Sequence, residues 1–204
     1  LVVKGTGHDY FGRSNAPNSL LVWTHRYRGV IVHENFKPLG APTEAKSVRA
    51  VSVKAGNRWL EVYQAASAAN CYVQGGGCTS VGACGGFALG GGFGSYSKKF
   101  GSGAGGVLEL EVVTADGRAL VANPHQNEDL FWALRGGGGG TFGIVSRMTL
   151  LAHPMPRTDG WLSGTLLASS DDAYQELIQR YIEFVAAALN NESWGEGVMF
   201  VKGK

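Results

Sequence analysis

Residues 74–94 read QGGGCTSVGACGGFALGGGFG, and ten of these twenty-one residues are glycine. Each glycine loses about 0.5–1 kcal/mol more than alanine when regular structure forms, because its backbone has more freedom to lose. Ten glycines therefore cost about 5–10 kcal/mol, which is comparable to the net stability of a domain. Either tight backbone packing or a bound group that the backbone N–H groups approach must offset this cost. The apolar residues Val81, Phe87, Leu89 and Phe93 distinguish the stretch from a polar, flexible linker.

The composition is that of a globular chain. Its length of 204 residues suffices for one large domain or for one domain and part of another. Hydrophobic residues make up 44% of the chain, which is usual for a globular protein. The net charge is +2 and no basic run exceeds Lys98-Lys99, so we expect no nucleic-acid partner. No apolar run has transmembrane length, so we expect no membrane partner either. Because the first residue is Leu1 rather than Met and both ends look strand-like, we expect a fragment cut at both ends. The absence of a signal peptide then says nothing about the location of the protein.

The cysteines Cys71, Cys78 and Cys84 cannot all pair internally, and their spacings do not match a zinc site. We therefore expect no metal and no disulfide framework in a chain of this length. Cys71 and Cys84 are interpreted as buried fillers. The remaining histidines apart from His8 are interpreted as surface or structural residues, namely His25, His33, His125 and His153.

Apolar patterning predicts an α+β fold with few helices. The expected strands are residues 1–3, 20–23, part of 26–40, 47–55, 107–114, 120–121, 142–151, 161–167 and 198–201. The strand from residue 47 alternates apolar and polar residues and is predicted to be half-buried. Asp116-Gly117 predicts a two-residue hairpin turn. A change of composition after Pro156 predicts a domain boundary near residues 152–160.

Three helices are expected. The first starts at Gly56-Asn57, with Asn57 as N-cap and with Leu60, Tyr63 and Ser67 on its inner face. A short second helix is capped by Asn127 and ended by Gly136. The third is capped by Ser169 or Ser170 and runs through Leu189, with one apolar face formed by Ala173, Leu177, Tyr181, Val185 and Ala188.

Three glycine turns stand out, at residues 5–7, 75–94 and 136–143. None is followed by the Lys-Ser/Thr of a Walker loop, and residues 90–94 lack the strand–helix context of a Rossmann fingerprint. Their order is informative through five runs: VKGTGHDY (3–10) with Arg13-Ser14, GGCTSVG (76–82), GGGFG (90–94), VTADG (113–117) and DLFWALRGGGGGTFG (129–143). Together these runs resemble the FAD-binding domain of vanillyl-alcohol-oxidase-type flavoproteins, and within that group the berberine-bridge-enzyme-like, FAD-linked oxidases.

The resemblance implies a domain plan. Residues 1–155 would form a PCMH-type FAD-binding domain of two α/β subdomains that lacks its N-terminal part. Residues 156–204 would begin an antiparallel-sheet substrate domain. The chain departs from the family where Ala104-Gly105-Gly106 replaces a polar run, which puts side-chain contacts from there in doubt. The family's catalytic base lies in sequence that is absent here, so the catalytic residues are unknown.

The resemblance also assigns the cofactor and its contacts. Residues 4–14, 75–94 and 136–145 would surround FAD, with the pyrophosphate over the first two segments. The implied cofactor-binding residues are Lys4, Gly5, Thr6, Gly7, His8, Asp9, Arg13, Ser14, Gly76, Gly77, Cys78, Thr79, Ser80, Val81, Gly82, Gly85, Gly86, Gly91, Gly92, Gly94, Gly143, Ile144 and Val145. A histidine nitrogen can attack the flavin 8α carbon and a cysteine thiolate can attack C6. We therefore expect covalent FAD through His8 and also Cys78, with attachment at His8 alone as the alternative.

The implied function is that of an oxidase. It would pass a hydride from a small alcohol, sugar or related substrate to FAD and on to oxygen, giving hydrogen peroxide. Two other classes stay open: a flavin-dependent sugar or lactone dehydrogenase with poor oxygen reactivity, and a flavin-binding module without turnover. Plainer interpretations also stay open for His8, as a hydrogen-bonded loop residue, and for Cys78, as a small hydrophobe. Phe131 and Trp132 are expected to face a core. The resemblance implies a secreted or periplasmic protein.

Overall fold

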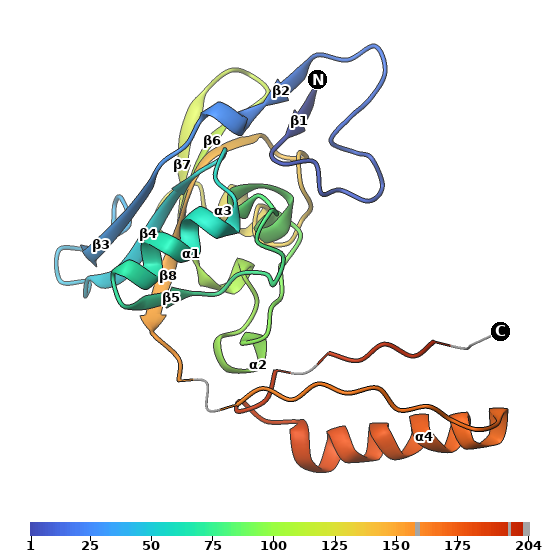
Figure 1. Ribbon diagram of the computed structural model, residues 1–204. Coiled ribbons are helices and arrows are strands. Elements are labelled where there is room, and N and C mark those ends of the chain that lie inside the picture. Colours follow the sequence, from blue (N-terminus) through green and yellow to red (C-terminus); the bar gives the residue numbers. More distant parts are fainter. Residues whose placement is uncertain (158–159, 196, 202–204) are drawn as a thin grey trace.

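The computed structural model describes residues 1–157, 160–195 and 197–201. Its main body is an antiparallel sheet with the strand order β3–β4–β8–β6–β7, and β5 pairs with the far end of β8 (Figure 1). The strands are β3 (Val30–Phe36), β4 (Val48–Lys54), β5 (Cys71–Val73), β6 (Val107–Val113), β7 (Ala119–Ala122) and β8 (Ile144–Pro154). A separate parallel pair, β1 (Val2–Lys4) and β2 (Leu21–Trp23), carries the N-terminus. The α+β class is confirmed.

The helices are short apart from the last. They are α1 (Trp59–Ala68), α2 (Ser97–Phe100), α3 (Glu128–Ala133) and α4 (Asp171–Phe184), with helical turns at Thr24–Arg26, Ala83–Phe87, Ala104–Gly106 and Val185–Leu189. The core lies between the sheet and α1, where Val51, Trp59, Val62, Leu110 and Met148 are almost fully buried. In the described part of the chain, no helix is long and apolar enough to cross a bilayer.

The predicted start of α1 was wrong. Asn57 does not cap the helix: its Oδ1 accepts a hydrogen bond from the Gly29 N–H at 2.7 Å, which ties two loops together. The helix begins at Trp59, and Glu61 Oε2 accepts from the Arg58 N–H at 2.6 Å. The inner face is consequently formed by Trp59, Val62 and Ala66, whereas Leu60 is 42% exposed. Of the residues predicted to face inward, Ser67 is exposed and Tyr63 packs at the margin of the core.

Two strand predictions also need correction. β4 is not half-buried, because it lies between β3 and β8 and its polar residue Ser52 is 3% exposed. Ser52 Oγ is satisfied there by Thr149 Oγ1 at 2.8 Å. The β6–β7 loop contains three residues rather than two, because the Thr114 N–H donates to Arg118 O at 3.0 Å. Gly117 takes the left-handed conformation (φ 82°) that such a three-residue loop requires.

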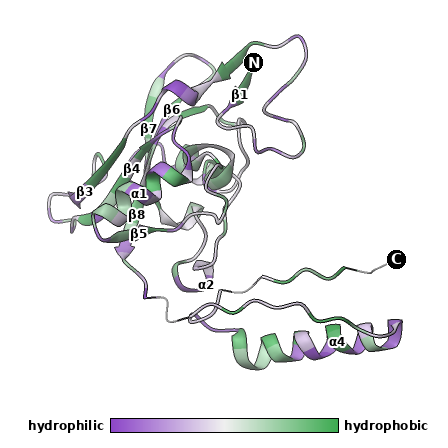
Figure 2. Ribbon diagram, in the orientation of Figure 1, coloured by the Kyte–Doolittle hydropathy of each residue, from purple (hydrophilic) through white to green (hydrophobic). Residues whose placement is uncertain are grey.

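Residues after β8 form an arm that leaves the sheet (Figure 1). Ser170 caps α4 as predicted, since its side chain accepts from the Ala173 N–H. The strands predicted at 161–167 and 198–201 do not form: the described residues there have no strand partner, and many of their apolar side chains are exposed. Figure 2 shows α4 with mixed polar and apolar colouring, and none of its residues is buried. The domain division at residue 155 stays a proposal.

Candidate functional site

The first glycine loop, residues 4–14, leaves β1 and turns back on itself. The Trp23 indole N–H donates to Gly5 O at 3.0 Å, and Gly7 has a left-handed φ of 82°. Arg13 and Asp9 form an ion pair of 2.7 Å, and this partner holds the pKa of the Asp9 carboxyl below its usual range. Arg13 is exposed and Asp9 is half-buried, and because the pair joins residues four positions apart, it fixes the shape of the loop.

The second loop, residues 74–94, is attached to the N-terminus of α1. The N–H groups of Trp59 and Leu60 donate to the carbonyls of Val81 and Thr79 at 2.9 and 3.0 Å. These bonds satisfy helix donors that lack partners inside the helix. The Tyr63 hydroxyl donates to Gly76 O at 2.7 Å, a contact that the sequence analysis missed because it gave Tyr63 only an apolar role. The loop is therefore held by its carbonyl groups.

All three glycine loops meet, as the sequence predicted. The Gly82 N–H donates to Thr6 Oγ1 at 2.8 Å, which joins the first loop to the second. The Gly138 N–H donates to Leu89 O at 2.8 Å, which joins the third loop to the second. A Cβ atom added at Gly139 would lie 3.1 Å from the Gly86 Cα. Segments more than forty residues apart in sequence thus form one surface.

Some of the predicted cofactor-binding residues are used by the sheet or by internal packing instead. Ile144 and Val145 belong to β8, where they pair with Val113 and Val112, and Val145 is buried. Gly143 packs so closely on β6 that an added Cβ would lie 2.7 Å from Val112. The carbonyls of Gly91 and Gly92 accept from the Ala104 and Gly103 N–H groups, so they serve internal packing. At these positions the structure shows a packing role.

Other predicted positions are left open by the fold. A Cβ atom added at Gly5, Gly77, Gly85 or Gly86 would meet nothing within 4 Å, and none of these residues has a left-handed φ. At Gly5, Gly77 and Gly86, packing therefore does not require glycine, whereas Gly85 has a backbone conformation (φ −98°, ψ −133°) outside the regions that L-residues favour. Among the described residues, the following N–H groups have no hydrogen-bond acceptor: Thr6, Gly7, His8, Gly77, Cys78 and Thr79. Glycine backbone with free N–H donors is what close approach of a phosphate requires.

Two nucleophiles lie at the meeting point of the first two loops. His8 Nε2 is 2.9 Å from Ser80 Oγ, and Cys78 Sγ is 3.3 Å from the same oxygen. All three side chains are exposed. Hydrogen bonds from the Ser80 hydroxyl and backbone lower the pKa of the Cys78 thiol, which favours its reactive thiolate form. The expected proximity of His8 and Cys78 is thus present in the structure.

The other cysteines contrast with Cys78, because Cys71 and Cys84 are buried and free, as predicted. The Cys84 thiol donates to Val53 O at 3.2 Å, and burial raises its pKa. The described residues contain no cluster of His, Cys, Asp and Glu that would hold a metal. Trp132 was predicted to face a core and is instead 81% exposed, whereas its neighbour Phe131 is buried.

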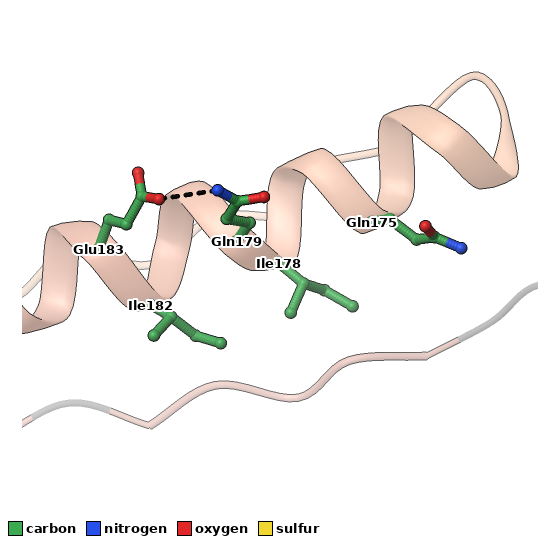
Figure 3. Close-up of a pocket in the computed structure, with 5 residues that line it drawn as sticks. All are labelled: Gln175, Ile178, Gln179, Ile182 and Glu183. Atoms are coloured by element: carbon green, nitrogen blue, oxygen red, sulfur yellow. Dashed lines mark hydrogen bonds between the residues drawn. The ribbon is translucent and has the colours of Figure 1, made fainter.

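Two hollows in the surface lie away from the glycine loops. One is formed by α4 alone, where Ile178 and Ile182 point to the same side and Gln179 is hydrogen-bonded to Glu183 (Figure 3). Another lies beside Arg49, Asn70 and His153. Neither includes a residue of the three glycine loops.

Comparison with known proteins identifies the family. The family model described as FAD binding domain matches residues 1–123. The VAO-type flavoprotein oxidase VAO615 of Thermothelomyces thermophilus is 43% identical over 187 residues, which are 92% of this chain and 31% of that protein. The FAD-linked oxidoreductase malF of Malbranchea aurantiaca is 48% identical over 153 residues, which are 74% of this chain and 26% of that protein.

Solved structures agree. The VAO-type flavoprotein MtVAO615 from Myceliophthora thermophila C1 matches with a TM-score of 0.69 and 43% identity, covering 74% of this chain and 27% of that one. Berberine bridge enzyme from Eschscholzia californica matches with a TM-score of 0.63 and 29% identity, and the match covers 76% of this chain and 29% of that one. The chain spans between a quarter and a third of the length of these relatives. It belongs to the FAD-binding-domain family, and its relatives are VAO-type FAD-linked oxidoreductases.

Proposed function

We propose that the whole protein is an oxidase that carries FAD covalently. It passes a hydride from a small alcohol, sugar or related substrate to the flavin and on to oxygen, which becomes hydrogen peroxide. The observation that supports this proposal is the convergence of His8 and Cys78 on Ser80, at the meeting point of two glycine loops. When bound, the flavin supplies the hydride chemistry, and the protein supplies position and electrostatics.

The glycine loops fit the pyrophosphate. Its two negative charges suit backbone N–H donors, and the free N–H groups of residues 6–8 and 77–79 lie on the two loops that Thr6 and Gly82 connect. Lys4 stands at the base of the first loop, with its Nζ 5.0 Å from the centre of the Trp23 ring. The open positions Gly5 and Gly77 allow a ligand to approach the backbone where a side chain would block it.

The Ser80 hydroxyl prepares both nucleophiles in one hydrogen-bonded chain. It donates to the Cys78 thiolate and accepts from the N–H at His8 Nε2, so that His8 Nδ1 carries a free lone pair. FAD bound here would be held by His8 Nδ1 at its 8α methyl carbon and by Cys78 Sγ at C6 of the ring. Each attachment would replace one C–H bond of the flavin and release one proton from the attaching residue and one from the flavin carbon, with two electrons passing through the flavin to oxygen, which would become hydrogen peroxide.

The substrate and the catalytic base belong to parts of the protein beyond the described residues. We propose that residues 156–204 begin the substrate domain and that oxygen and a small molecule are the partners, with no nucleic acid and no membrane. A secreted or periplasmic location is proposed on the family resemblance alone. Residues 1–204 should consequently turn over slowly when they are separated from the rest of the protein, and turnover at the full rate would contradict this.

Covalent attachment is tested in the full-length protein by flavin fluorescence in a denaturing gel. His8→Ala and Cys78→Ala should each retain fluorescence through the remaining bond, and the double variant should lose it. The matched control is His125→Ala, an exposed histidine outside the loops. Release of flavin from the wild-type protein by acid or heat would refute attachment. Peroxide release with a panel of alcohols and sugars separates the oxidase from a dehydrogenase, and flavin that no substrate reduces would point to a binding module.

A further inference from the structure

Asn191-Glu192-Ser193 is the only Asn-x-Ser/Thr tripeptide in the chain. With any residue except proline in the middle, this tripeptide is the acceptor pattern for N-linked glycosylation in secreted proteins. It follows the helical turn Val185–Leu189, which continues α4, and none of its residues takes part in the glycine loops. The tripeptide therefore lies outside the surface that the glycine loops form.

The three residues are exposed and form a defined turn. The Ser193 N–H donates to Asn191 Oδ1 at 2.9 Å, which closes an Asx turn across the tripeptide. Asn191 Nδ2 donates to Ala188 O at 2.9 Å. A carboxamide nitrogen carries two hydrogens, so this bond leaves one hydrogen for replacement by a sugar. The acceptor nitrogen is thus held in place and reachable.

The turn is anchored beside the acceptor. Leu189 is buried, and its carbonyl accepts from Lys98 Nζ at 2.6 Å, which connects the end of the arm to α2. An added Cβ atom at Gly195 would lie 2.1 Å from Ser95 O, so the chain also returns to the main body just after the tripeptide. The acceptor therefore lies between two fixed points and remains exposed.

We propose that Asn191 is an N-glycosylation site. Its Nδ2 forms a bond to C1 of the first sugar of a lipid-linked oligosaccharide diphosphate. The bond from C1 to the diphosphate oxygen breaks, and the displaced amide proton leaves with the lipid diphosphate. The modification places this turn on the surface of the whole protein and on the secretory side of a eukaryotic membrane, and it is independent of the flavin chemistry proposed above.

The site is tested by secreting the full-length protein from yeast and treating it with a glycan-releasing amidase in heavy-oxygen water. The peptide that contains Asn191 should carry a heavy-oxygen aspartate at that position. Asn191→Gln and Ser193→Ala should abolish the label at this peptide, whereas Ser193→Thr, which keeps the pattern, should retain or increase it. Asn190→Gln is the matched neighbour control and should leave the label unchanged. Flavin content, measured on the same samples, should be equal in all variants.

Mapping by peptide distinguishes Asn191 from any acceptor in the remainder of the protein. A secreted wild-type protein with unmodified Asn191 would overturn the proposal, as would a label that persists in Ser193→Ala. Loss of flavin attachment in the wild type, by contrast, would contradict the oxidase proposal and leave the glycan result unaffected.

Discussion

The glycines of residues 75–94 fall into two groups that look alike in sequence. On the core side, an added Cβ would lie 2.4 Å from the Tyr63 hydroxyl at Gly75, 2.5 Å from the Phe87 ring at Gly92 and 2.0 Å from Gly75 O at Gly94. On the loop side, an added Cβ at Gly77 or Gly86 meets nothing within 4 Å. Both explanations for a glycine-rich stretch therefore apply, each to a different part of it.

This difference separates folding from binding. The packed glycines exist because two backbones and the rings of Phe87 and Trp59 must approach closely, which any properly folded form of the chain requires. The open glycines have no such reason inside the chain. A ligand that lies on the free N–H groups of the same loop accounts for them.

Gly94→Ala should have the largest effect. Its Cβ would meet a backbone carbonyl at 2.0 Å, which no rotamer change relieves. We expect a loss of about 3 kcal/mol of stability, and with it a lower melting temperature. Thermal unfolding of the full-length protein measures this. A melting temperature equal to that of the wild type would show that the packed group is not required for folding.

Gly77→Ala is the matched substitution in the open group. We expect no loss of stability, because alanine fits the space. Alanine also lowers the conformational entropy of the unfolded chain, which raises the free energy of unfolding by about 0.4–1 kcal/mol. FAD must bind reversibly before either covalent bond can form, and we expect that binding to weaken about tenfold, which corresponds to about 1.4 kcal/mol, so that the flavin content of the purified protein falls. If Gly77→Ala changed neither the flavin content nor the stability, the open glycines would have no role in FAD binding, and the division into packed and open glycines would be wrong.

Gly117→Ala tests a third kind of glycine. It lies in the β6–β7 loop with φ 82°, and an added Cβ there meets nothing within 4 Å. The cost should come from backbone conformation alone, about 1 kcal/mol, with no change in flavin content. Thermal unfolding and flavin absorbance check both parts. Gly117→Asn should cost less, because asparagine tolerates the left-handed region better.

Sequence reasoning reached much of the fold. Apolar patterns identified β4, β6 and β8, and the N-cap of α4 was predicted correctly, because these signals are local. The face of α1 was missed since Asn57 is used by Gly29, a residue twenty-eight positions away. The strands expected at 161–167 and 198–201 are absent because a strand needs a partner, and the described residues supply none.

The candidate site was predicted from the order of its motifs. That order identified the three loops and the pair His8 and Cys78, which the structure brings together. It did not separate open from packed glycines, since that depends on distant neighbours such as Phe87. The motif order also did not predict that the Ser80 hydroxyl links His8 to Cys78, because the contact joins residues seventy-two positions apart. Ser80 was predicted only as one of the cofactor-binding residues, without this role.

Ser80→Ala should have the smallest effect and the most specific one. Without the hydroxyl, the pKa of the Cys78 thiol rises toward its usual value, because the thiolate loses its principal hydrogen bond. As the pH falls, the thiolate of the variant is protonated at a higher pH than that of the wild type. Alkylation of Cys78 in the flavin-free protein should therefore slow several-fold near neutral pH and converge with the wild-type rate in alkali. Ser80→Thr keeps the hydroxyl and should restore the rate, whereas equal pH profiles for Ser80→Ala and wild type would exclude this role for Ser80.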